Sequence, residues 1–290
     1  MPSTHPVLAV SISEPHDLVQ QGLGAIHVKH AFTELVRHVL AIGGSIAYGG
    51  DLRPGGYTAV LFELLRAYER HDRPGPERVL NFLAWPLWKG LTVADRARLK
   101  PIATLVEVTA PPGAPSDLPK PEERTAQERL WFWEGLTRMR EQMTRQADAR
   151  LILGGRISGQ LGLSPGVLEE AALTIRAGVP LFPIGGFGGC GKLVVAALAG
   201  EQLAEFTTAY QLANTSGYEQ LLDAAKDYDN NATPEAHTET LSKSGWQALN
   251  NGLNREENQR LATLDDIDEI IALVLRGLRS LPKRATSTDL

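Results

Sequence analysis

Paired glycines that follow short apolar runs are the residues of this chain whose spacing best suits ligand chemistry. The run Leu151–Leu153 ends in Gly154, Gly155 and Arg156. A buried strand that ends in glycines lets backbone amides come close to a bound group, usually a phosphate or a ribose. The pattern therefore predicts a pocket for a nucleotide-type ligand. A second apolar run ends in the glycine-rich segment Gly185, Gly186, Phe187, Gly188 and Gly189.

The segment between these two glycine clusters carries two adjacent acids. A helix is expected to begin near Pro165 and Gly166, and its free amides and positive dipole end suit a phosphate. Glu169 and Glu170 lie in its first turns, where acids commonly do no more than complement the helix dipole. The flanking glycines favour the other interpretation, a ribose or phosphate pocket that includes these carboxylates.

Two arginines are candidates for the same pocket. Arg156 follows a strand and a glycine pair, so it either binds a phosphate through two parallel hydrogen bonds or is a surface arginine. Arg140 lies beside the apolar stripe of a long predicted helix. It either points into the pocket or keeps the flank of the helix solvated.

The first half of the chain has a similar cluster after the apolar run Ser45–Tyr48. Asp51, the acid that follows the glycine pair of this cluster, either holds ribose hydroxyls or shapes a turn. Polar residues also follow the first predicted strand, where a phosphate-contacting loop commonly lies. The candidates from this half are Ser13, Glu14, Tyr48, Gly49, Gly50, Asp51 and Arg53.

Alternating strand and helix patterns are expected to position these residues. Short β-branched apolar runs predict strands, and apolar residues three or four apart predict helices. Their alternation is typical of an α/β fold with a doubly wound, mostly parallel sheet and helices on both faces, and it brings the glycine segments to one edge of the sheet. The predicted strands are 7–13, 45–48, 78–84, 102–108, 149–153 and 179–184, and the predicted helices are 25–41, 59–70, 121–147, 165–177 and 192–199.

The domain organisation predicted from these patterns is a single Rossmann-like domain over residues 1–282. Its core is expected at about 7–200 and a helical C-terminal extension at 201–282, with a frayed tail at 283–290. Residues 227–240 are polar and predict a loop. Thr263 has an acid three positions later and predicts the start of the last helix.

Composition excludes several classes of protein. The chain has 290 residues, 43% of them hydrophobic, and a formal net charge of -5, so no basic surface for nucleic acid or anionic membrane is expected. No apolar window approaches the ~20 residues of a membrane span, and the N-terminus does not resemble a secretory signal. Its one cysteine, Cys190, can form no disulfide within the chain. We expect a cytoplasmic protein with neither a metal site nor a bound cofactor.

The order of these motifs resembles the SLOG superfamily, which includes the lonely-guy phosphoribohydrolases and nucleotide-sensing domains. The resemblance covers roughly Val7 to Leu198. It rests on the loop after the first strand, Tyr48-Gly49-Gly50, Met139-Arg140, Leu153-Gly154-Gly155, Pro165-Gly166-Val167-Leu168-Glu169-Glu170 and Gly185-Gly186-Phe187-Gly188-Gly189. The resemblance also implies a homo-oligomer.

The resemblance implies roles for three residues. In the phosphoribohydrolases an arginine and a glutamate act on the N-glycosidic bond of a nucleotide. Carried over by motif, these are Arg140 and either Glu169 or Glu170. The segment Pro165–Glu169 departs from the enzymes because it lacks their Gly-x-Gly-Thr core.

Two functions therefore remain open. The first is binding of a nucleotide or NAD-derived, ADP-ribose-like ligand, which the missing motif residues favour. The second is an N-glycoside hydrolase or deoxyribosyltransferase-like enzyme in which Glu169 or Glu170 is the catalytic carboxylate. A third class, an interaction module with no ligand, is disfavoured because glycine-lined strand ends destabilise a fold unless they serve a ligand.

Overall fold

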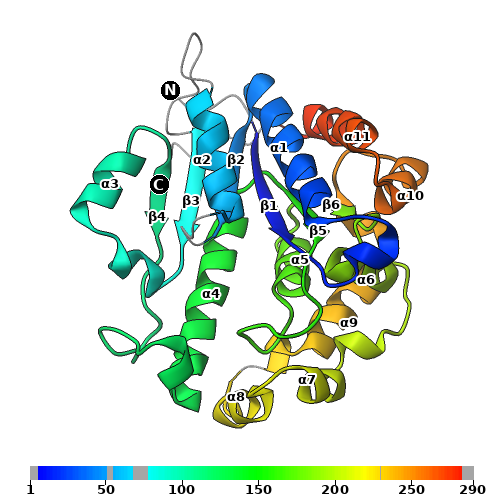
Figure 1. Cartoon of the computed structure of the whole chain (residues 1–290). Helices are drawn as coiled ribbons and strands as arrows, with labels where there is room; N and C mark the ends of the chain where they lie inside the picture. The colour runs from blue at the N-terminus through cyan, green and yellow to red at the C-terminus, as the bar shows by residue number, and fades with distance from the viewer. Residues whose placement is uncertain (1–5, 51–54, 68–77, 229, 283–290) are drawn as a thin grey trace.

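The computed structural model describes residues 6–50, 55–67, 78–228 and 230–282. Within these residues six strands form one sheet in the order β4-β3-β2-β1-β5-β6, and every neighbouring pair is parallel (Figure 1). The sheet confirms the predicted doubly wound α/β fold. The strands are β1 (Val7–Ser13), β2 (Ser45–Gly49), β3 (Val79–Leu83), β4 (Thr104–Glu107), β5 (Ala149–Gly154) and β6 (Leu181–Ile184).

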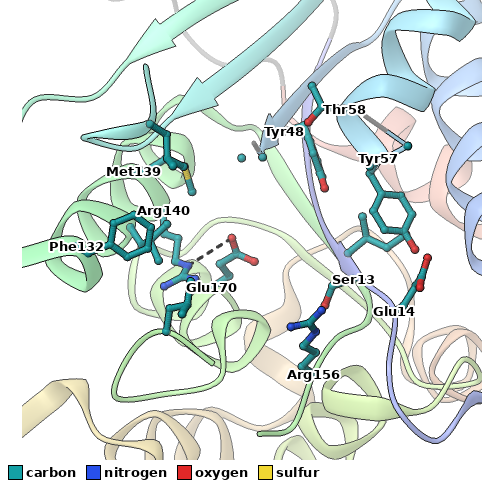
Figure 2. Close-up of a pocket in the computed structure, with 18 of the residues that line it drawn as sticks. Ser13, Glu14, Tyr48, Tyr57, Thr58, Phe132, Met139, Arg140, Arg156 and Glu170 are labelled. Atoms are coloured by element: carbon teal, nitrogen blue, oxygen red, sulfur yellow. Dashed lines mark ion pairs between the residues drawn. The ribbon is translucent and has the colours of Figure 1, made fainter. Parts of the chain in front are cut away.

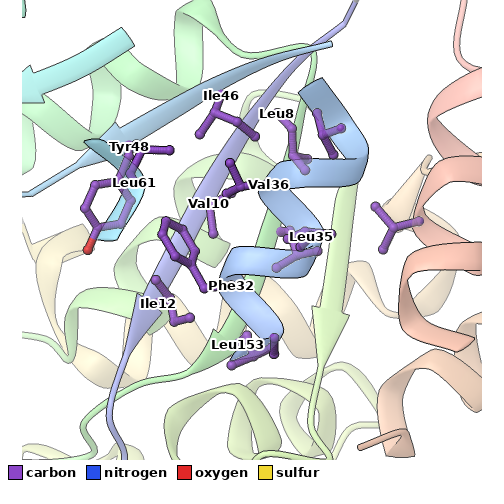
Figure 3. Packing of buried hydrophobic residues seen from close by; sticks show 14 of the residues in the cluster. Leu8, Val10, Ile12, Phe32, Leu35, Val36, Ile46, Tyr48, Leu61 and Leu153 are labelled. Carbon is purple, nitrogen blue, oxygen red and sulfur yellow. The ribbon is translucent and has the colours of Figure 1, made fainter. Parts of the chain in front are cut away.

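Side-chain alternation along β1 separates the two faces of the sheet. Leu8, Val10 and Ile12 pack with helix α1 on one face, as Figure 3 shows. Ala9 lies on the other face in a cluster with Met139 of helix α4. Both faces are buried, as a parallel sheet requires. The helices of this part of the chain are α1 (Ala25–Ala41), α2 (Tyr57–Ala67), α3 (Val93–Leu99), α4 (Ala126–Gln146), α5 (Gly166–Arg176) and α6 (Gly189–Leu198).

The strand order reverses direction at β1. The chain adds β2, β3 and β4 outward on one side of β1 and then returns through α4 to place β5 on its other side. Loops that leave neighbouring strands in opposite directions open a crevice at their carboxyl ends, and ligands of open α/β sheets bind there. The reversal in strand order therefore lies between β1 and β5, and such a crevice is expected beyond their carboxyl ends.

The C-terminal helices pack against several parts of the sheet layer. Helix α8 contacts α4, α9 contacts α5 and α6, and α11 contacts α1. In Figure 1, α7 and α8 lie below the carboxyl ends of the strands. None of the described helices is both long and apolar enough to cross a membrane. The C-terminal helices are α7 (Thr208–Asn214), α8 (Tyr218–Ala224), α9 (Pro234–Ser244), α10 (Arg255–Thr263) and α11 (Ile267–Ser280).

Two predictions for the C-terminal part are wrong in detail. The predicted loop 227–240 contains the start of α9, where the Thr233 side chain accepts the Ala236 amide hydrogen and Pro234 occupies the first turn. The last helix begins at Ile267 instead of near Thr263, because Asp266 is its N-cap and accepts from the Glu269 amide. The start of α9 was missed because its sequence is mostly polar. The start of α11 was misplaced because both Thr263 and Asp266 have an acid three positions later. The predicted tail 283–290 lies outside the described residues.

Candidate functional site

A cleft of about 540 Å³ lies at the carboxyl ends of β1 and β2. Figure 2 shows Phe132, Met139 and Arg140 of α4 on one side of it, and Tyr48, Tyr57 and Ser13 on the other. The loop after β5 and the first turns of α5 complete the wall. The cleft is therefore built at the reversal in strand order, from segments far apart in the sequence.

Most of the candidate site residues predicted at the ends of the first two strands line this cleft. Its lining includes Ser13, Glu14, Tyr48, Gly49, Gly50, Arg140, Arg156 and Glu170. Gly166 lines an adjoining cavity of about 220 Å³ that shares Arg140, Arg156 and Glu170 with the cleft. Asp51 and Arg53 lie outside the described residues. The lining of neither cavity includes Gly154, Gly155, Pro165, Glu169, Gly185, Gly186, Phe187, Gly188 or Gly189.

Glycines at the end of β2 allow the cleft walls to come close together. A Cβ at Gly49 would lie 2.7 Å from the Met139 Cε of α4, and one at Gly50 would lie 2.3 Å from the Tyr48 ring. Both distances are shorter than van der Waals contact, so a side chain at either position would force neighbouring groups to move. The paired glycines thus serve the packing of the wall, with backbone facing the cleft.

Positive groups outnumber negative ones around the cleft. Among the described lining residues, Lys29, Arg124, Arg140 and Arg156 are cationic, whereas Glu14 and Glu170 are the acids. Arg156 is exposed and makes no hydrogen bond or ion pair with any described residue. A cationic excess on a chain of net charge -5 focuses a positive field in the cleft and favours an anionic ligand.

The two adjacent acids of α5 have different surroundings. Glu169 is 2% exposed, and its carboxylate accepts hydrogen bonds from Thr137 Oγ1 at 2.5 Å and Arg140 Nη1 at 2.7 Å. Glu170 lines the cleft, and its Oε1 lies 3.8 Å from both Arg140 Nε and Arg150 Nη1. The Glu170 carboxylate accepts no hydrogen bond from a described residue. Of the two, Glu170 is the carboxylate that a ligand in the cleft can touch.

Arg150 is a component of the site that the sequence analysis missed. It is fully buried in β5, and its guanidinium donates to Ser11 Oγ at 2.7 Å and to Thr144 Oγ1 at 2.8 Å. Burial lowers the pKa of Arg150, while the nearby Glu170 carboxylate opposes that shift. An arginine inside the apolar strand 149–154 was the available signal, because a buried charge requires partners. Arg150 lies behind Glu170 and holds a second positive charge beside it.

The glycine-rich segment after β6 packs against other backbone instead of the cleft. A Cβ at Gly186 would lie 2.0 Å from the Leu264 carbonyl oxygen in the connection between α10 and α11. The Asp17 carboxylate accepts the Gly189 amide hydrogen at 2.9 and 3.1 Å, so an acid of the chain occupies the N-terminus of α6. Cys190 is fully buried, and burial raises the pKa of its thiol.

Apolar side chains of α4 form part of the cleft wall, next to Arg124 and Arg140. Phe132, Leu136 and Met139 project from one side of α4, and the Arg124 guanidinium lies 4.3 Å from the centre of the Phe132 ring. The hydroxyl of Tyr57 is buried without a hydrogen-bond partner among the described residues. Burial raises the pKa of this phenol, and the negative charge of Glu14 raises it further. The phenol therefore stays protonated and neutral.

The part of the chain that the structure describes holds no group of three His, Cys, Asp or Glu side chains placed to bind a metal ion. The side chains that line the cleft are cations, two carboxylates, hydroxyl-bearing residues and apolar groups. This combination suits a ligand with both an anionic part and a flat apolar part.

Comparison with known proteins agrees with the resemblance to the SLOG superfamily. No curated protein matches the sequence. The sequence matches a protein family described as SLOG cluster2 over residues 3–261, which extends beyond the sheet into the C-terminal helices as far as α10. The match covers well over half of the chain, and the chain therefore belongs to the SLOG cluster2 family.

Proposed function

We propose that the cleft binds a nucleotide or an NAD-derived ligand of the ADP-ribose type. Membership in a SLOG family points to a nucleotide-related function. The observation that carries the proposal is the excess of cations at the reversal in strand order, in a chain that is acidic as a whole. Phosphate groups are the part of a nucleotide that such a site attracts.

Each wall suits one part of such a ligand. Arg156 and Lys29 supply donors for phosphate oxygens, and Arg156 is free to bind in a bidentate manner. Leu136 and Met139 offer an apolar surface for a base. The Glu14 carboxylate, at the end of β1, is placed to accept hydrogen bonds from ribose hydroxyls.

Replacement of Arg156 tests this proposal. Arg156→Ala should weaken binding of ADP or ADP-ribose by ~1–3 kcal/mol, or roughly 5- to 150-fold in Kd, because a charge-assisted contact to phosphate is lost. Isothermal titration calorimetry measures the change. Arg279→Ala is the matched control, because Arg279 is exposed on α11 and does not line the cleft. Equal affinities in the wild type and Arg156→Ala would place the phosphate elsewhere.

The second candidate function is hydrolysis of an N-glycosidic bond, and the position of Glu170 favours it. Its carboxylate lines the cleft and accepts no hydrogen bond from a described residue. A carboxylate in this position stabilises the positive charge that develops on the ribosyl carbon as the base leaves and water adds. Glu169 is less suited to this role, because Thr137 and Arg140 occupy its oxygens.

Incubation with AMP, dAMP and NAD followed by chromatography for free base separates the two functions. Binding without release of base supports a ligand-binding role. Release of base that Glu170→Gln abolishes, with ligand affinity retained, supports the enzyme. Release that persists in Glu170→Gln would remove Glu170 as the catalytic carboxylate.

A further inference from the structure

A second cavity of about 230 Å³ continues from the cleft toward the C-terminal helices. We refer to it as the distal cavity. It lies between the beginning of α4 and the turn that joins α7 to α8, and Gln160, Ser216 and Leu221 are among its lining residues. The cleft and the distal cavity share Arg124 and Phe132, so one ligand can extend from one into the other.

Gln160 lines the distal cavity, and one acceptor of its side chain has no partner among the described residues. The Gln211 Nε2 donates to the carbonyls of Ile157 and Glu205 at 3.0 and 2.9 Å, which turns the Gln211 oxygen toward Gln160. Gln160 Nε2 donates to that oxygen at 2.8 Å. Of the hydrogen-bonding atoms of this pair of glutamines, the Gln160 Oε1 is the one left without a partner: it is buried and makes no hydrogen bond to any described residue. A buried acceptor in this state is unfavourable until a donor reaches it.

Arg124 lies at the junction of the two cavities. Its guanidinium lies over the Phe132 ring, and its Nε donates to the Pro119 carbonyl at 3.0 Å. These contacts hold the side chain in place, and its two terminal nitrogens make no hydrogen bond or ion pair with a described residue. Burial lowers the pKa of Arg124, although the nearby acids Glu128 and Glu122 oppose the shift. A fixed cation at a junction suits the phosphates that link two halves of a ligand.

We propose that the distal cavity binds the terminal sugar of a nucleoside diphosphate sugar whose nucleotide half occupies the cleft. This inference rests on the proposed function of the cleft. Arg124 faces the diphosphate, and the orphaned Gln160 oxygen accepts a hydrogen bond from a sugar hydroxyl. The C-terminal extension thereby selects a two-part ligand over a simple nucleotide, because the α7–α8 turn forms the outer wall of the distal cavity.

Titration with ADP and ADP-ribose tests the assignment, since these two probes share the base and the diphosphate and differ in the terminal ribose. The wild type should bind ADP-ribose at least about tenfold more tightly than ADP, since one additional hydrogen-bonded group of this kind is worth about that factor. Ser216→Trp fills the distal cavity and should remove this preference without changing the affinity for ADP. Gln220→Trp is the control, because Gln220 is exposed on α8 outside the lining of the distal cavity.

The outcomes separate the inference from the function on which it rests. Equal wild-type affinities for ADP and ADP-ribose, or a preference that survives in Ser216→Trp, would overturn the distal subsite and leave the nucleotide site intact. Failure of the wild type to bind either probe would overturn both proposals. Unchanged binding of ADP by Ser216→Trp shows that this variant is folded.

Discussion

Glu169 and Glu170 are neighbours in the sequence with different chemical surroundings. Successive residues of an α-helix point about 100° apart, so the two carboxylates of α5 face different groups. Glu169 is held by Thr137 and Arg140, whereas Glu170 reaches the cleft. Glu169 fixes the position of Arg140, and Arg140 in turn lines the cleft.

Glu169→Gln is expected to destabilise the protein. The amide keeps the shape of the side chain but leaves the largely buried Arg140 without its closest negative charge. Breaking a buried ion pair on one side should lower the free energy of unfolding by about 3 kcal/mol, as measured by urea denaturation. Glu239→Gln makes the same change in an exposed pair with Lys243 and should have little effect. A loss no larger than that of the control would mean that Glu169 does not stabilise Arg140.

At the scale of elements, two helices that both begin at a glycine have different surroundings at their N-termini. Gly166 begins α5 close to the Arg140 guanidinium, where a Cβ would lie 2.7 Å from Nη2, and Gly166 lines the cavity that adjoins the cleft. The N-terminus of α6 is instead occupied by the Asp17 carboxylate. Glycine allows close approach at both ends, but the group that comes near is the Arg140 guanidinium at α5 and the Asp17 carboxylate at α6.

Gly186→Ala tests whether the β6–α6 turn is structural. An added methyl group would meet the Leu264 carbonyl, which is backbone and cannot move aside as a side chain does. Overpacking of this kind should lower the free energy of unfolding by about 2–3 kcal/mol. The affinity of the remaining folded protein for ADP-ribose should be unchanged, because Gly186 does not line the cleft. Thermal unfolding and calorimetry measure the two quantities.

Gly90→Ala is the control for this substitution, because open space surrounds that position and its backbone conformation is ordinary. It should leave both stability and affinity near wild type. A Gly186→Ala protein with normal stability and weakened binding would instead return this turn to the ligand site.

At the scale of the whole molecule, the C-terminal helices contact the helices that line the cleft; α9, for example, packs against α5. His237 of α9 is 2% exposed, and its Nδ1 lies 2.9 Å from the Ser164 hydroxyl, just before α5. Burial lowers the pKa of His237 to about 3, and the charges of Arg176 and Arg140 contribute to the shift. The imidazole is therefore neutral in the folded protein at neutral pH, and acid affects the packing of α9 against α5.

Stability should fall in mild acid because of His237. The unfolded chain takes up a proton near pH 6.5, the folded chain only near pH 3, so stabilisation is complete above pH 6.5 and declines between these values. The free energy of unfolding should fall by up to about 1.4 kcal/mol per pH unit in that window from this group alone. Urea denaturation of the wild type and of His237→Gln at pH 7.5, 5.5 and 4.5 gives the free energy of unfolding at each pH. The contribution of His237 is the difference between the two proteins in the slope of this free energy against pH. Parallel pH profiles would show that His237 is not the responsible group.

Most of the fold could be predicted from the sequence, because strands and helices are marked by local patterns. The run 7–13 is rich in apolar and β-branched residues, and the run 149–153 is apolar apart from Arg150. The glycine pair after the second run marks where the backbone turns. Helices such as α9 were missed where polar composition hid a short amphipathic pattern. The strand-end residues Ser13, Tyr48 and Arg156 were predicted near a common edge because parallel strands share one direction, and they line one cleft.

The sequence by itself determined the alternating elements, the parallel sheet and the edge at which the cleft forms, because these follow from short-range periodicity and chain direction. Tertiary structure alone decided which polar groups face that site. It directed Glu170 toward the cleft and Glu169 toward Arg140, buried Arg150 behind them, and turned the Gly185–Gly189 segment toward Asp17 and Leu264. The physical reason is that buried charges and close backbone contacts are satisfied by whichever group packing brings near, and those partners lie as far as 172 positions away along the chain.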